Sequence, residues 1–216
     1  MIGPDILQGA EKLWNGLLVT LYLIAVSAPA GLALGVLVGL TQTYGGRLLR
    51  GLAIGYQVSF RGVPLVVQLF ILYYGLPRLG ITLSPFSAAI LGFTLCSGAY
   101  HAEYVRGAVL SVPDGQMEAG RAVGMTLGQT VRSVILPQVV RKALPGCSNE
   151  IVYLIKYSSL AYLVTVVDLT GQGRLIAYAS FRFLETFFIV GLIYLALVAI
   201  ASSALRAVER RLRIPT

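Results

Sequence analysis

The stretch GQMEAGRAVGMTLGQTVRSVILPQ (residues 115–138) is polar, whereas the segments on both sides of it are strongly apolar. Pro113 and Asp114, just before it, suit the start of a helix. Proline fits the first turn, and an acidic side chain is favoured at the positive end of the helix dipole. Gly124 predicts the end of this helix, because glycine adopts the left-handed conformation without steric cost.

A second helix is predicted directly after this glycine turn. Thr126 and Gln129 have the spacing of a capping box, in which each side chain pairs with the other residue's backbone N–H. Val131 and Val134 give the helix an apolar stripe, and Pro137 is expected to bend or end it. The stretch is therefore an amphipathic helix–turn–helix, covered either by lipid headgroups or by a partner protein.

The composition of the chain is that of a membrane protein. Of its 216 residues, 56% are hydrophobic and only 12% are charged. A soluble domain has about 25% charged residues. A bilayer span needs roughly 20 mostly apolar residues, and such a span is a helix because its backbone groups must pair internally. We expect an all-α, polytopic fold with one transmembrane domain over residues 13–210. Its five predicted spans are 13–40, 52–76, 86–110, 140–165 and 184–206.

The basic residues divide unequally between the two sides that five spans create. The connection 41–51, the connection 111–139 with its flanks, and the C-terminal tail hold Arg47, Arg50, Arg106, Arg121, Arg132, Arg141, Lys142, Arg206, Arg210, Arg211 and Arg213. The other side holds only Lys12, Arg78, Arg174 and Arg182. The positive-inside rule then places the N-terminus outside and the C-terminus in the cytoplasm. The formal charge of +8 is spread over separate loops, which argues against a nucleic-acid partner.

Charged groups inside spans are costly and usually mark a function. Glu103 lies in the third predicted span and Glu150 in the fourth. Tyr153 and Tyr157 follow Glu150 on the same helical face, whereas Lys156 lies roughly 120° away from it. Two carboxylates facing a water-filled cavity would hold the ammonium or guanidinium group of a substrate.

Several ionisable residues have structural alternatives. Glu103 is equally well explained by an ion pair with Arg106 or with a charge on another helix. His101 is expected to be a packed, hydrogen-bonded side chain rather than a titrating group. The residues near the predicted outer surface would either contact a binding protein or be solvated; they are Asp168, Arg174, Arg182 and Glu185. No metal site is expected.

The polar stretch resembles the EAA loop of ABC-importer permeases, which has the pattern E-A-x-x-x-x-G followed by an apolar residue and Leu-Pro. The matching residues are Glu118, Ala119, Gly124, Val134, Leu136 and Pro137, with Gly120 where the family usually has Ala. The stretches RGVPLVVQLFILYYGLP (61–77), SGAYHAEYVRGAV (97–109), LPQVVRKALP (136–145) and FRFLE (181–185) extend the resemblance. Together they resemble the polar amino-acid uptake permeases, which serve histidine, arginine, glutamine and glutamate, and imply the type I ABC importer permease fold.

This resemblance implies that the loop 111–139 couples the chain to a pair of cytoplasmic ATPase subunits. The coupling residues would be Glu118, Ala119, Gly120, Gly124, Leu136 and Pro137. None of the three lysines lies in a G-x-x-x-x-G-K-[ST] phosphate loop, so ATP and Mg²⁺ are expected on the ATPase. The other implied partners are a second permease chain, the same or a sister, and an extracytoplasmic solute-binding protein. The implied location is the bacterial inner membrane.

The implied substrate is a polar amino acid, with a basic or neutral-polar side chain favoured. Its expected contacts are Glu103, Glu150, Tyr153 and Tyr157. Tyr157 stands where relatives often have Asp, which argues for a side chain smaller or less charged than that of arginine.

Two other functions compete with this one. An ion-coupled secondary transporter or channel would use Glu103, Glu150 and Lys156 as a relay, and would transport without nucleotide. An intramembrane enzyme is disfavoured, because a nucleophile needs an oriented base and no such pair is found in the spans. The chain is expected to be a transport subunit and not an enzyme.

Overall fold

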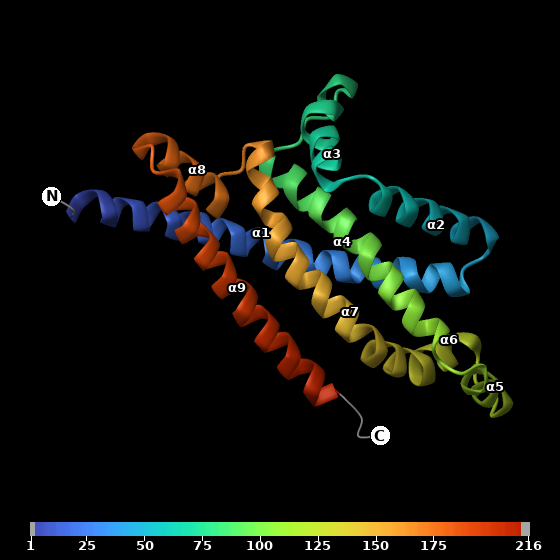
Figure 1. Ribbon diagram of the computed structural model, residues 1–216. Helices are drawn as coiled ribbons and strands as arrows, with labels where there is room; N and C mark the ends of the chain where they lie inside the picture. Colours follow the sequence, from blue (N-terminus) through green and yellow to red (C-terminus); the bar gives the residue numbers. More distant parts are fainter. Residues whose placement is uncertain (1–2, 213–216) are drawn as a thin grey trace.

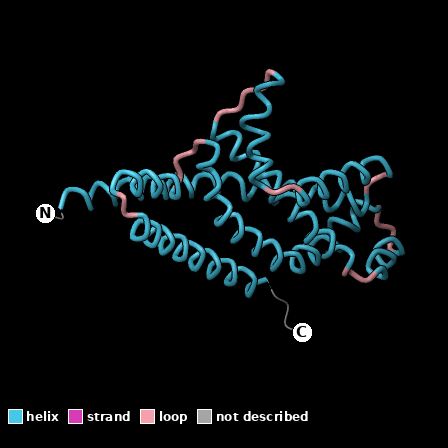
Figure 2. The backbone as a smooth tube through the Cα atoms, turned by 45° about the horizontal axis from the view of Figure 1, so that its top comes forward, coloured by secondary structure: helices cyan, strands magenta, loops and turns pink. Residues whose placement is uncertain are grey.

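The structure, a computed structural model, describes residues 3–212 of the chain, with side chains from Gly9 onward; Arg213 lies outside this range. All regular elements in the described range are helical (Figures 1 and 2). The α-helices are α1 (Gly3–Tyr44), α2 (Arg47–Gly62), α3 (Leu65–Phe70), α4 (Pro85–Leu110), α5 (Asp114–Ala122), α6 (Leu127–Thr130), α7 (Leu136–Tyr157), α8 (Leu169–Ser180) and α9 (Phe183–Leu212). The all-α prediction is confirmed.

Two of the described helices are long and apolar enough to cross a bilayer, namely Gly9–Tyr44 of α1 and the whole of α9. Two bent pairs bring the number to as many as four, if each pair crosses as one span. Helix α4, with 26 residues, is about 39 Å long and so has the length to cross. It carries two buried polar side chains, Ser97 and His101, and packs against α1, α2 and α7. The number of five spans stays a prediction.

The second predicted span, 52–76, is not one continuous helix. Helices α2 and α3 meet at a bend of 104° (Figure 1). The cause is Pro64, which has no N–H to donate and holds Val63 in an extended conformation (φ −96°, ψ 130°). The amide of Gln68 donates to the carbonyls of Phe60 and Val63 at 2.8 and 2.7 Å. This side chain therefore satisfies backbone groups that the break leaves open.

Helices α1 and α4 approach closely along a row of glycines on α1. A Cβ added at Gly31 would lie 2.6 Å from Oγ of Ser97, and one at Gly39 would lie 2.9 Å from the carbonyl oxygen of Ala102. A Cβ at Gly35 would collide with Cβ of His101. Small residues let membrane helices pack with their backbones close together. This row places the backbone of α1 directly against α4.

Pro137 was expected to bend or end its helix, but the helix does not end there. The chain passes from α6 through a π-helical turn, Val131–Ile135, directly into α7, which continues to Tyr157. Proline lacks an N–H and crowds the carbonyl four residues earlier. Pro137 lies in the first turn of α7, directly after the wider π-helical turn, and this local widening of the helix accommodates the proline without ending the helix.

Helix α8 follows the fourth predicted span and was not expected from the sequence. Its N-cap is Asp168, whose side chain accepts a hydrogen bond from the N–H of Gly171 at 2.9 Å. Gly171 and Gly173 weaken the helical pattern of this segment. The chain then turns at Phe181, which has a positive φ of 57°, into α9.

The basic connections of the chain gather at one end of the molecule. A buried apolar cluster joins the ends of α4 and α7 to Ile135, and Tyr44 and Met117 pack against it from α1 and α5. Figure 1 shows α5 and α6 at this end. Arg141 of α7 and Arg206 of α9 line one pocket there. The fold thus places connections 41–51 and 111–139 and the end of α9 on the same side.

Candidate functional site

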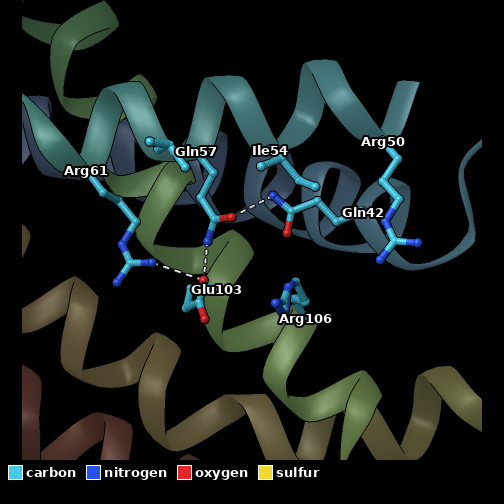
Figure 3. A pocket seen from close by; sticks show the side chains of 8 residues that line it. Gln42, Arg50, Ile54, Gln57, Arg61, Glu103 and Arg106 are labelled. Atoms are coloured by element: carbon cyan, nitrogen blue, oxygen red, sulfur yellow. Dashed lines mark hydrogen bonds and ion pairs between the residues drawn. The ribbon is translucent and has the colours of Figure 1, made fainter. Parts of the chain in front are cut away.

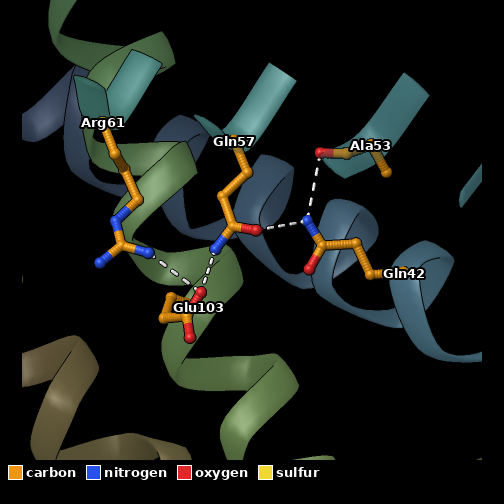
Figure 4. Close-up of polar contacts among 5 residues, drawn as sticks. All are labelled: Gln42, Ala53, Gln57, Arg61 and Glu103. Atoms are coloured by element: carbon orange, nitrogen blue, oxygen red, sulfur yellow. Dashed lines mark hydrogen bonds and ion pairs between the residues drawn. The ribbon is translucent and has the colours of Figure 1, made fainter. Parts of the chain in front are cut away.

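A chain of polar contacts joins the C-terminal end of α1 to α2 and α4 (Figure 4). The amide of Gln42 donates to the carbonyl of Ala53 at 3.1 Å and to Oε1 of Gln57 at 2.7 Å. The amide of Gln57 in turn donates to Oε2 of Glu103. Nη1 of Arg61 forms an ion pair with the same oxygen at 3.0 Å. One carboxylate oxygen therefore receives donors from two residues of α2.

This network lines a pocket of about 290 Å³ between α2 and α4 (Figure 3). The side chains of Arg61 and Glu103 are 39% and 41% exposed. Charged groups at membrane depth do not face lipid; they face a partner or a water-filled cavity. The lining residues are Gln42, Arg50, Ile54, Gln57, Val58, Arg61, Glu103 and Arg106.

The sequence left two possible ion-pair partners for Glu103, namely Arg106 or a charge on another helix. Its partner is a charge on another helix, Arg61, and not Arg106, which lines the same pocket. The sequence analysis did not single out Gln42, Gln57 or Arg61 as site residues. The available signal was the presence of Gln57 and above all Arg61 inside the predicted apolar span 52–76. Gln42 lies outside the predicted spans, in the connection 41–51, and gave no such signal.

The other predicted substrate contacts lie on α7 and divide into two environments. The rings of Tyr153 and Tyr157 stack at 6.0 Å between centroids, so they do share a face. Nζ of Lys156 lies 4.1 Å from the ring centroid of Tyr153. Glu150, by contrast, is 1% exposed, and its Oε1 has no hydrogen-bond partner among the described residues. The structure therefore brings the two tyrosines together but buries the carboxylate.

The residues predicted to lie near the outer surface differ in their surroundings. Asp168 is fully buried; besides capping α8 it accepts a hydrogen bond from the hydroxyl of Tyr194 at 3.2 Å, so the expectation that it lies at the surface is wrong. Arg174 is exposed and its guanidinium lies over the ring of Tyr162 at 5.5 Å.

His101 is buried as expected, but no hydrogen bond to either ring nitrogen is found within the described range.

The loop between α4 and α7 has the local structure that its sequence predicts. Gly124 has a φ of +85°, and the N–H of Met125 donates to the carbonyl of Gly120 at 3.1 Å. This is the Schellman ending of a helix. Thr126 and Gln129 form both hydrogen bonds of the capping box. The predicted helix, glycine turn and second helix are confirmed.

The two short helices of this loop are held rigidly and expose one face. A Cβ at Gly120 would lie 2.5 Å from Cγ2 of Thr130, so the absence of a side chain lets α5 pack against α6. Nζ of Lys142 donates to the carbonyl of Ser111 at 2.6 Å and closes the base of the loop. Glu118 and Ala119 are exposed, as is the apolar Val123 at 79%.

The six predicted coupling residues are not all on that face. Glu118, Ala119, Gly124 and Pro137 are exposed, Leu136 is half-buried, and Gly120 is buried against Thr130. Gly120 therefore shapes the loop instead of offering a contact.

Comparison with known proteins gives the family. Residues 31–214 match the family described as binding-protein-dependent transport system inner membrane component. The glutamine transport system permease protein GlnP of Escherichia coli (strain K12) is 38% identical over 98% of this chain and 94% of that protein. The arginine transport system permease protein ArtQ of Bacillus subtilis (strain 168) is 36% identical over 92% of this chain and 91% of that protein.

A solved structure has the same fold. The crystal structure of an amino acid ABC transporter with histidines superposes with a TM-score of 0.87 and 31% identity, covering 95% of this chain and 96% of that chain. Sequence and structure thus agree over nearly the whole length. The chain belongs to the family of binding-protein-dependent transport system inner membrane components, as the multi-pass permease subunit of an amino-acid ABC importer.

Proposed function

We propose that this permease carries a polar amino acid with a basic or neutral-polar side chain across the inner membrane, along the face that Glu103 and Arg61 share. The observation that carries this proposal is their partly exposed ion pair, because a charge at this depth needs water or a partner chain in front of it. The stacked rings of Tyr153 and Tyr157 lie on α7, which packs against α4, and would extend the polar face.

A second permease chain, the same or a sister, would cover this face and enclose the pathway. One chain offers a single layer formed by α2, α4 and α7, with α1 behind it (Figure 3). Transport sites commonly lie between helical bundles at the bilayer midplane. Pairing would convert the pocket beside Glu103 into part of an enclosed, water-filled path.

The loop of α5 and α6 is the proposed docking site for the cytoplasmic ATPase. Glu118 and Val123 would contact its surface, and Gly124 would fix the turn between the two helices. The loop is joined to α4 and α7 through Met117 and the buried cluster beneath it. Movement of the docked ATPase would therefore reach the polar face as movement of whole helices. ATP and Mg²⁺ are assigned to that ATPase, and delivery of the amino acid to an external binding protein.

Glu103, more than Glu150, is the proposed first carboxylate to meet the substrate. Glu103 is accessible, and its Oε1 carries no hydrogen bond within the described range. Glu150 lies behind the accessible surface and would need a displacement of α7 to take part. The three residues of the proposed ion relay do not contact one another, since Glu103 pairs with Arg61 and Lys156 lies over Tyr153.

The test is uptake by the assembled complex, with its ATPase and binding protein, in liposomes. Labelled glutamine, arginine, lysine, histidine and glutamate are compared with and without ATP. Uptake of a basic or neutral-polar amino acid that requires ATP supports the proposal. Glu103→Gln should lower that uptake about tenfold or more, because a hydrogen bond to a charged group contributes about 1.5–3 kcal/mol.

The matched control is Glu11→Gln, an exposed carboxylate on α1, which should leave uptake unchanged. Uptake that proceeds equally without nucleotide would contradict the role of this chain in an ATP-driven importer. Unchanged uptake by Glu103→Gln would remove the carboxylate from the pathway.

A further inference from the structure

We infer that the pocket between α2 and α4 binds the α-carboxylate of the transported amino acid, with Arg50 and Arg106 as the binding residues. The inference rests on the proposed function and deepens it. It assigns a binding group to the main-chain part of the substrate, which is common to amino acids with different side chains.

The charges lining the pocket do not balance. Three guanidinium groups, those of Arg50, Arg61 and Arg106, face one carboxylate, Glu103. Arg61 is paired with Glu103. Arg50 and Arg106 have no ion pair or side-chain hydrogen bond to any residue within 3–212. The pocket therefore keeps two unpaired cations, and an anion entering it would meet both.

The two arginines approach the pocket from different helices. Figure 3 shows Arg50 extending from α2 and Arg106 from α4 toward the space between them. A guanidinium group binds a carboxylate with two parallel hydrogen bonds, and it stays charged at any physiological pH. The pocket, at about 290 Å³, is at the lower end of the size range of small-molecule sites.

The same pocket offers acceptors for an ammonium group. Oε1 of Gln42 is buried without a hydrogen-bond partner, and Figure 3 shows it pointing toward α4. Oε1 of Glu103 also carries no hydrogen bond among the described residues. Two free cations and two free acceptors around one cavity match the zwitterionic head of an α-amino acid. The substrate side chain is left to other residues of the pathway.

Phospholipid phosphate is the competing anion. Arg50 lies one turn after the start of α2, on the side where the basic connections gather, and basic pockets between helices there can hold anionic headgroups. A carboxylate site discriminates between an amino acid and its decarboxylated amine. A phosphate site does not.

The test uses the permease–ATPase complex in nanodiscs, without the binding protein, whose own selectivity would otherwise dominate. Binding of L-arginine is compared with agmatine, and binding of L-glutamine with 4-aminobutanamide; each pair differs only by the α-carboxylate. For the amino acid that the complex transports, the carboxylate form should bind about ten- to a hundredfold more tightly. In the double variant Arg50→Gln/Arg106→Gln this ratio should fall to about one, with binding of the amine unchanged.

Arg47→Gln is the matched control, because Arg47 is an exposed arginine of α2 outside the pocket, and it should keep the full ratio. Unchanged binding of the amine also reports that the double variant is folded. Equal binding of both members of a pair by the wild-type complex would overturn the inference, as would a ratio that survives the double substitution. Loss of the ratio when phosphatidylcholine discs are replaced by phosphatidylglycerol discs would assign the arginines to lipid headgroups instead.

These outcomes are separable from those of the proposed function. A complex that takes up an amino acid with ATP, yet binds it no better than its amine, retains the proposed function and loses only the carboxylate site. A complex that neither binds nor transports any of the amino acids loses both.

Discussion

Glu103 and Glu150 occur on neighbouring helices, yet their surroundings are opposite. Glu103 is 41% exposed and its Oε2 receives donors from Arg61 and Gln57. Glu150 is buried with one oxygen unpartnered. Burying an ionised carboxylate without donors costs free energy, whereas a paired and partly hydrated one is tolerated. This difference assigns the accessible part of the site to α2 and α4 and leaves α7 to contribute aromatic side chains.

The turn at Gly124 gives a prediction for a single residue. Its φ of +85° is strained for a β-branched residue by about 1–3 kcal/mol. Nothing lies within 4 Å of an added Cβ, so the backbone alone is tested. Gly124→Val should reduce co-purification of the ATPase with the permease, while membrane insertion is unchanged. Gly124→Asn is the control, since Asn tolerates this conformation, and it should retain the ATPase. Equal recovery of the ATPase with both variants would show that the turn does not determine docking.

Single residues of the site could be predicted from the sequence, but the contacts between them could not. Glu103 stood out because a charge in an apolar span is costly. Its partner could not be chosen, because Arg106 is near in the sequence whereas Arg61 is near only in the folded chain. Gln57 is neutral and gives only a weak signal in a span, and Gln42 lies in the predicted connection 41–51, where a polar residue is ordinary. The helix–turn–helix between α4 and α7 was predictable because its caps depend on local spacing alone.

Among the helices, too, features that depend on local sequence were predicted, and features that depend on tertiary packing were not. The long apolar runs correctly predicted helices at the places of α1, α4, α7 and α9. The break at Pro64 was visible as a proline, yet its angle of 104° depends on how Gln68 and the packing of α4 hold the two pieces. Helix α8 is short and contains two glycines, and tertiary packing against α1 and α9 supplies the stability that its sequence lacks.

Substitution by alanine should change the thermal stability in opposite directions at two glycines, one at the α1–α4 contact and one on α2. Gly35→Ala should lower the thermal stability of the purified permease, because its Cβ would collide with His101 and overpacking costs about 1–3 kcal/mol. Gly55→Ala, on the open face of α2, meets nothing within 4 Å. It should raise stability slightly, since alanine in a helix is favoured over glycine by about 0.5–1 kcal/mol. Thermal unfolding in detergent measures both. A destabilising effect of equal size at the two positions would mean that the α1–α4 contact is not close.

At the scale of the whole molecule, the basic residues and the fold agree on one polarised arrangement. The connections 41–51 and 111–139 lie at the same end as the arginines of α9. The opposite end holds the tip after α3, where the hydroxyl of Tyr74 donates to the carbonyl of Leu163 at 3.0 Å. A polarised charge distribution orients a membrane protein with its basic end in the cytoplasm.

This arrangement predicts which positions are accessible from outside an intact cell. Single cysteines are placed at Gly46 and Gly128, in the two basic connections, and at Leu79, which is 76% exposed at the opposite end. Both glycines have open space around an added Cβ. The native Cys96 and Cys147 are buried, and replacing them with alanine removes background reaction. An impermeant maleimide should label Leu79→Cys only, and all three variants should react once the membrane is permeabilised. Labelling of Gly46→Cys or Gly128→Cys before permeabilisation would invert the orientation and place the proposed ATPase-docking loop outside the cell, where no cytoplasmic ATPase could reach it.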